Sequence, residues 1–237
     1  MPIVVLDPGH GGNDPGAQSN GIIEKDLALN IGLKVRDWLL NCYDADVRMT
    51  RETDTFVSLS DRASFANQLN ADYFVSLHHN AGGGEGFESF VYSGTRSGKS
   101  GQMQDFVHAE VMAYLGPLGV KDRGKKEANF AVLRETKMSA ILLENLFVDN
   151  VMDATLLKDS ELIKELARAI ARGIGNAMGL VELYPPGTPD WKKDAVGWLY
   201  AQGHLTDPSW KQKIEQPLPL WAEAVILQKL YRKLEGS

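Results

Sequence analysis

Residues 2–10 read Pro2-Ile3-Val4-Val5-Leu6-Asp7-Pro8-Gly9-His10, an apolar run that ends in a turn and a histidine. An uninterrupted run of this kind is typical of a parallel strand that is buried on both faces. The pattern returns at residues 71–80, Ala71-Asp72-Tyr73-Phe74-Val75-Ser76-Leu77-His78-His79-Asn80, where two histidines end the run. Because open α/β sheets bind ligands at the carboxyl ends of their strands, both segments predict histidines at a functional edge.

Strand and helix patterns alternate through residues 1–180. Strands are predicted at residues 2–7, 45–50, 73–77, 86–92, 129–133 and 139–144, and helices at residues 24–40, 60–69, 100–115 and 160–178. Ser60 and Ser160 are the predicted N-caps of two helices, since serine is favoured at that position. The alternation predicts the α/β class, with a twisted, mostly parallel sheet flanked by helices.

The composition changes after residue 183. Residues 184–189, Tyr-Pro-Pro-Gly-Thr-Pro, have the composition of a linker. We therefore expect one domain at residues 1–183 and a small all-α domain at residues 190–237. Within the smaller domain, helices are expected at about residues 190–202 and 219–234, and it holds four of the five tryptophans.

Charge and cysteine content narrow the classes of function. The 237-residue chain has a net charge of −6 and no basic stripe, so no nucleic-acid partner is expected. Cys42 is the single cysteine, which excludes an internal disulfide and a cysteine-ligated zinc site. No apolar run approaches the roughly 18 residues of a membrane span, so no membrane insertion is expected. No signal peptide precedes the first strand, which predicts that the protein is cytoplasmic when made.

The strand-end histidines are candidate metal ligands. His10 lies in Asp7-Pro8-Gly9-His10-Gly11-Gly12, where glycines let the backbone approach a ligand closely. The turn lacks the patterns of phosphate-binding loops, and an incidental histidine in a turn is the alternative interpretation. His78 and His79 should point to opposite faces of their strand, and the residues alone leave open which of them faces a shared site.

Two glutamates complete a candidate zinc site. Glu24 begins a helix, a position that the helix dipole favours for any acid, so alone it indicates little. Glu144 follows the apolar run 139–143 and precedes Asn145-Leu146-Phe147, and burial of a carboxylate there is costly without a metal or an ionic partner. A salt bridge to Arg51 or Arg62 is the alternative interpretation of Glu144. Two imidazoles and two carboxylates are sufficient for a catalytic zinc centre.

These segments together resemble the zinc-dependent N-acetylmuramoyl-L-alanine amidases of bacterial autolysins and phage endolysins. The resemblance covers about residues 1–180. The matching stretches are residues 6–17, Glu24-Lys25-Asp26-Leu27, Thr50-Arg51, Leu59-Ser60-Asp61-Arg62, Ala66-Asn67, residues 71–81, Phe130-Ala131-Val132-Leu133-Arg134 and Leu142-Leu143-Glu144. Several dispersed matches that occur in order along the chain are far more specific than any one of them.

The resemblance implies a role for each candidate residue. By position, His10, Glu24 and His78 would bind Zn²⁺, with His79 as the alternative second histidine because it replaces a residue that is usually small. Glu144 would be the catalytic glutamate. The family commonly continues with Thr/Asn-Gly-Phe, where this chain has Asn145-Leu146-Phe147.

The implied reaction is hydrolysis, by zinc-activated water, of the amide bond between N-acetylmuramic acid and L-alanine in peptidoglycan. Glu144 would act first as general base and then as general acid. Asn80 and Arg134 are the candidates for contacts with the substrate.

Other functions and roles stay open from the sequence. A zinc peptidase acting on the stem peptide and a non-catalytic cell-wall-binding protein are the alternatives to an amidase. The missing signal peptide favours an endolysin that a separate holin releases to act on the cell wall, ahead of a non-secreted autolysin. The tryptophans of residues 190–237 suit either a sugar-binding surface or a helical core, and we expect Trp191, Trp198 and Trp221 to form the core.

Overall fold

The structure is a computed structural model that describes residues 1–235, without the side chains of Trp221 and residues 232–235. The chain divides into two compact units, which we describe separately. Unit 1 holds residues 1–40 and 44–181, and unit 2 holds residues 41–43 and the chain from residue 182 onward. No helix of the described residues is both long enough and apolar enough to cross a membrane.

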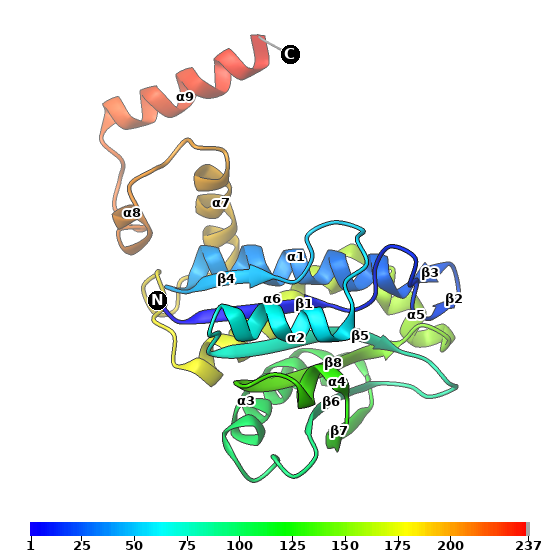
Figure 1. Cartoon of the computed structure of the whole chain (residues 1–237). Helices are drawn as coiled ribbons and strands as arrows, with labels where there is room; N and C mark the ends of the chain where they lie inside the picture. Colours follow the sequence, from blue (N-terminus) through cyan, green and yellow to red (C-terminus); the bar gives the residue numbers. More distant parts are fainter. Residues whose placement is uncertain (236–237) are drawn as a thin grey trace. The chain divides into compact units, whose positions relative to one another are not determined.

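Unit 1 contains the sheet and most of the helices (Figure 1). Its elements are β1 (Ile3–Pro8), β2 (Gln18–Ser19), β3 (Ile22–Ile23), α1 (Glu24–Cys42, whose last two residues belong to unit 2), β4 (Asp46–Met49), α2 (Leu59–Gln68), β5 (Tyr73–Asn80), β6 (Phe87–Tyr92), α3 (Lys99–Leu115), the 3-10 helix η1 (Gly116–Leu118), β7 (Asp122–Ala128), α4 (Ala131–Arg134), β8 (Ser139–Phe147), α5 (Val151–Leu157) and α6 (Ser160–Met178).

Six strands form one mixed sheet in the order β4-β1-β5-β8-β6-β7. The strands β4, β1, β5 and β8 are parallel neighbours, whereas β6 is antiparallel to β8 and parallel to β7. This confirms the predicted α/β class and the mostly parallel sheet. The carboxyl ends of β1, β5 and β8 therefore meet at one edge, beside the start of β6.

Helices cover both faces of the sheet. On one face α1 approaches closely, because Gly32 lies against Pro8 and Leu77. On the same face Gly173 of α6 lies against Val107 of α3. The other face packs against α2 and α4 through a core cluster that includes Val5, Ala66, Phe74, Val132, Leu133, Ala140 and Leu142. Burial of these apolar side chains fixes the sheet between two helical layers.

Three local predictions in unit 1 are wrong: the strand at residues 129–133 and the two N-caps, Ser60 and Ser160. Residues 129–133 are not a strand, because Ala131–Arg134 form the helical turn α4, which buries Val132 and Leu133 against the sheet. The strand lies earlier, at β7, which is an edge strand of polar sequence. The N-cap of α2 is Ser58, whose side chain accepts a hydrogen bond from Asp61 N, and the N-cap of α6 is Asp159.

Unit 2 contains α7 (Asp190–Ala201), α8 (Ser209–Gln212) and α9 (Leu220–Glu235). The segment predicted as a linker belongs to this unit and is packed. The Tyr184 side chain is buried, and its hydroxyl donates to Asn41 Oδ1 over 2.8 Å. The Lys211 Nζ donates to Asn41 O over 2.6 Å.

The expected tryptophan core of unit 2 is wrong for two of its three members. Trp191 is 67% exposed and Trp198 is 50% exposed, while Tyr184 is only 2% exposed. The tyrosine supplies the large buried aromatic group that the prediction assigned to tryptophan. The side chain of Trp221 lies outside the described residues.

Candidate active site

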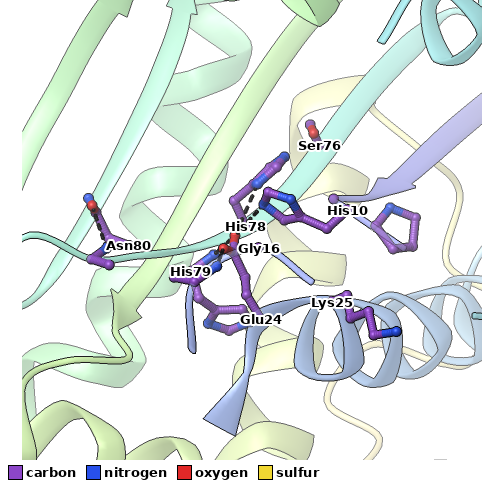
Figure 2. A network of polar contacts seen from close by, with 12 residues as sticks. His10, Gly16, Glu24, Lys25, Ser76, His78, His79 and Asn80 are labelled. Carbon is purple, nitrogen blue, oxygen red and sulfur yellow. Dashed lines mark hydrogen bonds and ion pairs between the residues drawn. The ribbon is translucent and has the colours of Figure 1, made fainter. Parts of the chain in front are cut away.

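Three predicted metal ligands converge at the carboxyl edge of the sheet. His10 follows β1, Glu24 begins α1 and His78 lies near the end of β5. Glu24 Oε1 lies 3.1 Å from His10 Nε2 and 3.1 Å from His78 Nδ1 (Figure 2). The three ligand atoms all lie within 4.8 Å of one another. Among the described residues, His10, Glu24 and His78 form the group of side chains whose spacing would allow them to bind a metal ion.

The donor set and its spacing fit a zinc ion. Ligands about 2.0–2.2 Å from a tetrahedral zinc lie about 3.3–3.5 Å from one another, close to the two distances measured around Glu24 Oε1. Burial raises the pKa of Glu24, but hydrogen bonds from His10 and His78 outweigh it and hold the pKa well below its ordinary value. The carboxylate is therefore ionised, as a metal ligand must be. Two imidazoles and one carboxylate leave a tetrahedral ion a fourth position for water.

Two glycines let these side chains approach one another. A Cβ atom at Gly9 would lie 2.2 Å from His78 Cε1. A Cβ atom at Gly16, which has φ of +65°, would lie 2.6 Å from Glu24 Oε2 and 2.7 Å from His10 Cδ2. His10 itself adopts φ of 59°, which is uncommon for a residue other than glycine. The glycine-rich turn after β1 is thus shaped around the side chains of the cluster.

Asp14 is a site residue that the sequence analysis missed. Its Oδ2 lies 2.9 Å from His10 Nδ1, on the side of the ring away from Glu24. Histidines that bind metals commonly donate their second ring N–H to a carboxylate, which fixes the tautomer and orients the ring. Asp14 lies four residues after His10 in the same turn. The feature of the sequence that could have indicated Asp14 is the presence of an acidic residue in the turn that carries His10.

Buried arginines hold the turn in place. Arg62 pairs with the fully buried Asp7 over 2.8 Å, and its Nη2 donates to His10 O over 2.7 Å. Arg51 donates to Gly9 O over 2.7 Å and to Pro8 O over 3.0 Å. These contacts occupy both guanidinium groups. The alternative interpretation, in which one of these arginines pairs with Glu144, is therefore wrong.

Glu144 lies beside His78, on the neighbouring strand of the sheet. The two residues are register partners in the parallel pairing of β5 with β8. Glu144 Oε2 is buried and has no hydrogen-bond partner. Burial, together with the charges of Glu24 and Glu88, raises the pKa of Glu144 to about 7 although His78 opposes the shift. A carboxyl group with a pKa near neutrality can both accept and deliver a proton.

His79 points to the opposite face of β5. The ring Nδ1 donates to Asn145 O over 2.6 Å, and the side chain is 2% exposed. Burial lowers the pKa of His79 to about 4, so the ring is neutral. The backbone N–H of His79, rather than its ring, contacts Glu24 Oε1 over 3.1 Å. The structure thus places His78, and not His79, beside the other two candidate ligands.

The two residues predicted to contact substrate have different surroundings. Asn80 Nδ2 donates to Glu88 Oε1 over 2.6 Å, next to the cluster but pointing away from it (Figure 2). Arg134 is exposed at the end of α4, where it contacts Asn129 and Glu135.

A pocket of about 80 Å³ opens beside the candidate ligands, lined by His10, Asp14, Phe56, Val57, Leu59, Arg62 and His78.

The fold and the cluster define an α/β protein with a candidate hydrolytic metal centre at the carboxyl edge of its sheet. Comparison with known proteins identifies the family. Residues 4–176 match the family model of the N-acetylmuramoyl-L-alanine amidases, and the chain belongs to this family. This confirms the resemblance drawn from the sequence. The chain is thus a peptidoglycan amidase, acting on the bond between N-acetylmuramic acid and L-alanine.

Individual relatives agree with the family match. The chain is 47% identical over 178 residues to the N-acetylmuramoyl-L-alanine amidase CwlM of Bacillus licheniformis, covering 75% of this chain and 69% of the relative. It is 46% identical over 180 residues to the endolysin of Bacillus phage SPP1, covering 75% of this chain and 66% of the relative. The crystal structure of an N-acetylmuramoyl-L-alanine amidase from Clostridium difficile 630 matches with a TM-score of 0.71 and 35% identity, covering 75% of this chain and 97% of that chain.

Proposed function

We propose that the chain is a zinc-dependent amidase in which His10, Glu24 and His78 bind the metal and Glu144 is the catalytic residue. The observation that carries the proposal is the meeting of three ligand atoms within 4.8 Å, beside a buried carboxyl oxygen that has no partner. Zinc, when bound at such a site, activates water and polarises the carbonyl group that is attacked. The donor atoms of this chain match that requirement in type and spacing.

The residues of the chain divide the remaining work. Glu144 accepts a proton from the attacking water and delivers it to the leaving nitrogen of L-alanine, which a pKa near 7 permits in both directions. Asp14 holds the His10 ring so that Nε2 faces the metal position. Arg62 holds the His10 backbone, and Gly9 leaves room for the His78 ring.

Variants separate metal binding from proton transfer. Glu144→Gln should keep stoichiometric zinc and lose about 10²–10⁴-fold in kcat, because it removes general acid–base catalysis alone. His10→Ala should lose zinc as well as activity. Removal of the metal with EDTA should abolish activity, and added zinc should restore it. Undiminished hydrolysis by the EDTA-treated protein would refute the metal mechanism.

Product chemistry tests which bond is cut. Digestion of purified peptidoglycan should release stems with a free amino-terminal L-alanine and leave an intact lactyl group on N-acetylmuramic acid. New termini found only inside the stem would instead identify the chain as a peptidase. Measurement of both termini by mass spectrometry distinguishes the two reactions in one digest.

For unit 2 we propose binding to the cell wall. Trp191 and Trp198 of α7 are 67% and 50% exposed, and exposed aromatic faces of this kind can stack on sugars. Co-sedimentation of the full chain with peptidoglycan should weaken in Trp191→Ala and Trp198→Ala, with zinc content unchanged. Equal sedimentation of all three proteins would refute this role.

We further propose that the chain acts as an endolysin that a separate holin releases to the wall. The proposal is supported by 46% identity to a phage endolysin. Expression of the chain in host cells should cause lysis only when a holin is co-expressed. Lysis without the holin would refute dependence on a separate pore, and a turnover role as an autolysin would then be favoured.

A further inference from the structure

A cluster of charged residues adjoins the candidate catalytic glutamate on the side away from the metal ligands. Glu88 of β6 is the register partner of Glu144 of β8, so the two residues lie directly opposite each other. Glu88 Oε2 accepts hydrogen bonds from Arg123 Nε over 2.9 Å and from Lys126 Nζ, both on β7. The side chain of Glu88 is 5% exposed.

The cluster carries an excess positive charge that is open to solvent. One carboxylate faces two cations, and hydrogen bonds from both cations outweigh burial and hold the pKa of Glu88 below its ordinary value. Arg123 is 27% exposed and Lys126 is 39% exposed, so both can take a further anionic partner. This local excess occurs in a chain whose net charge is −6.

Protection of an edge strand does not explain these two cations. Edge strands such as β7 often carry lysines that prevent pairing with other chains. Lys125 fits that role, because it turns to the opposite face and contacts Asp105 of α3 over 2.6 Å. Arg123 and Lys126 instead turn over the sheet toward Glu88, and Arg123 also stacks on Phe147 with 4.7 Å from Cζ to the ring centre. Their charges are thus fixed beside the reaction centre.

Strand spacing relates this charge to the substrate. Residues opposite each other on antiparallel strands have Cα atoms about 4.5–5.5 Å apart, so the cations gathered at Glu88 lie about one strand from Glu144. In an N-acetylmuramoyl peptide the nitrogen of the cleaved amide belongs to L-alanine. The next residue, D-glutamate linked through its side chain, carries a free α-carboxylate roughly one to two residue lengths, about 4–7 Å, from that nitrogen.

The opposite side of the centre has a different character. The pocket beside His10 and His78 is lined by Phe56 and Leu59, which are 51% and 57% exposed. An apolar and aromatic wall suits the glycan side of the cleaved bond, whereas the cations of β7 suit the peptide side. The charge distribution therefore orients the stem peptide across β8, β6 and β7.

We propose that Arg123 and Lys126 bind the free α-carboxylate of the second stem residue. This contact makes the enzyme prefer stems with D-isoglutamate to amidated stems with D-isoglutamine. The inference rests on the proposed function, because it assumes that the bond is cut between the metal ligands and Glu144.

Two soluble muramyl peptides that differ only at this carboxyl group test the proposal. The ratio of their kcat/KM values is the readout, because changes in zinc affinity or in Glu144 alter both rates equally and cancel. The zinc-loaded full chain should prefer the carboxylate peptide by about tenfold, as expected for one charge-assisted hydrogen bond at a partly exposed site. Lys126→Met should reduce that ratio to about one to threefold.

Two further variants make the test specific. Lys125→Met alters a lysine of matched exposure, 37%, on the opposite face and should keep the ratio of the unaltered chain. Glu88→Gln frees both cations from their carboxylate and should raise the ratio, whereas a purely structural cluster would not. A ratio near one in the unaltered chain, or one unchanged in Lys126→Met, overturns the carboxylate subsite while leaving the amidase proposal intact. Failure to cut either peptide at the lactyl amide overturns the proposed function instead.

Discussion

His78 and Glu144 are the last residues in regular register between β5 and β8. His78 pairs with Glu144, but the next pair joins Asn80 to Phe147, so β8 carries one extra residue in a bulge. Leu146, within that bulge, has φ of 65°. The bulge follows directly on the pair that brings a candidate zinc ligand beside Glu144, the proposed catalytic residue. Bulges commonly occur next to active sites, where they direct side chains.

The raised pKa of Glu144 predicts a pH-dependent stability of the metal-free protein. Below about pH 4 the carboxyl group is protonated in the folded and the unfolded chain. As the pH rises, the unfolded chain ionises first, and the folded chain keeps its proton until about pH 7. The free energy of unfolding of the metal-free protein therefore falls between about pH 4 and pH 7, by about 3 kcal/mol at most.

Glu144→Gln isolates this contribution. In EDTA-treated protein the variant should be more stable than the unaltered chain at pH 8, by up to about 3 kcal/mol, and similar to it at pH 4. Urea unfolding at pH 4, 6 and 8 measures the difference. Glu161→Gln, at an exposed position of α6, controls for the loss of an acid. A difference between Glu144→Gln and the unaltered chain that is constant with pH would contradict the buried, ionisable site.

The contact of Asp14 with His10 predicts a contribution to zinc affinity. Asp14→Asn should weaken zinc binding about 10–100-fold, because the carboxylate that orients the ring is lost while all three ligands stay. Competition with a zinc chelator measures the affinity directly. Asp54→Asn is the matched control, since Asp54 contacts Lys25 and Gly12 N rather than a candidate ligand. Equal zinc affinities of the two variants would show that Asp14 does not contribute to zinc binding.

The close approach of Gly9 to His78 predicts a second effect on the metal. In Gly9→Ala the new methyl group would lie 2.2 Å from His78 Cε1, so the imidazole must move. Zinc affinity should fall by at least about tenfold, as for loss of ligand orientation. Gly116→Ala is the control, because the nearest atom to its Cβ is 3.9 Å away. Unchanged zinc binding by Gly9→Ala would show that His78 is not held against this glycine.

How far the sequence predicts the site depends on how each residue is placed. His10 and His78 could be found because buried strands leave unmistakable apolar runs, and the sheet fixes where those runs end. The choice of His78 over His79 came from the resemblance, since alternation along a strand does not say which face is which. Asp14 contacts His10 through a turn whose shape depends on positive φ values at His10, Gly11 and Gly12. Such a turn leaves no periodic pattern in the sequence, so the contact could not be predicted from it.

The fold itself was predictable except where packing overrides local pattern. The sequence pattern does not predict β7, because its polar sequence, Asp-Arg-Gly-Lys-Lys-Glu-Ala, suits an edge strand and lacks a continuous apolar run. Residues 129–133 resemble a strand in sequence because Val132 and Leu133 are adjacent and apolar. Both are buried from a single helical turn instead. The exposure of Trp191 reflects a third limit, since composition does not tell which aromatic residue of a small unit is buried.

Leu146 offers a test of strain at the bulge. A side chain in the left-handed region costs roughly 1–2 kcal/mol, and glycine escapes this cost. At ordinary positions glycine is instead less stable than alanine by roughly 0.5–1 kcal/mol. Because Leu146 is fully buried and has φ of 65°, both replacements lose its packing but only glycine loses the strain.

Leu146→Gly should therefore be as stable as Leu146→Ala or more stable, by up to about 1 kcal/mol. Leu143, buried on the same strand without a positive φ, is the matched position, and there the glycine variant should be the less stable of the two. Denaturant unfolding of the four variants measures both differences. If glycine were the less stable replacement at both positions, the bulge would carry no strain. In that case the leucine that replaces the family's common glycine would have no effect on stability. Greater stability of Leu146→Gly than of Leu146→Ala would instead show that the buried leucine side chain is retained although its backbone conformation is unfavourable.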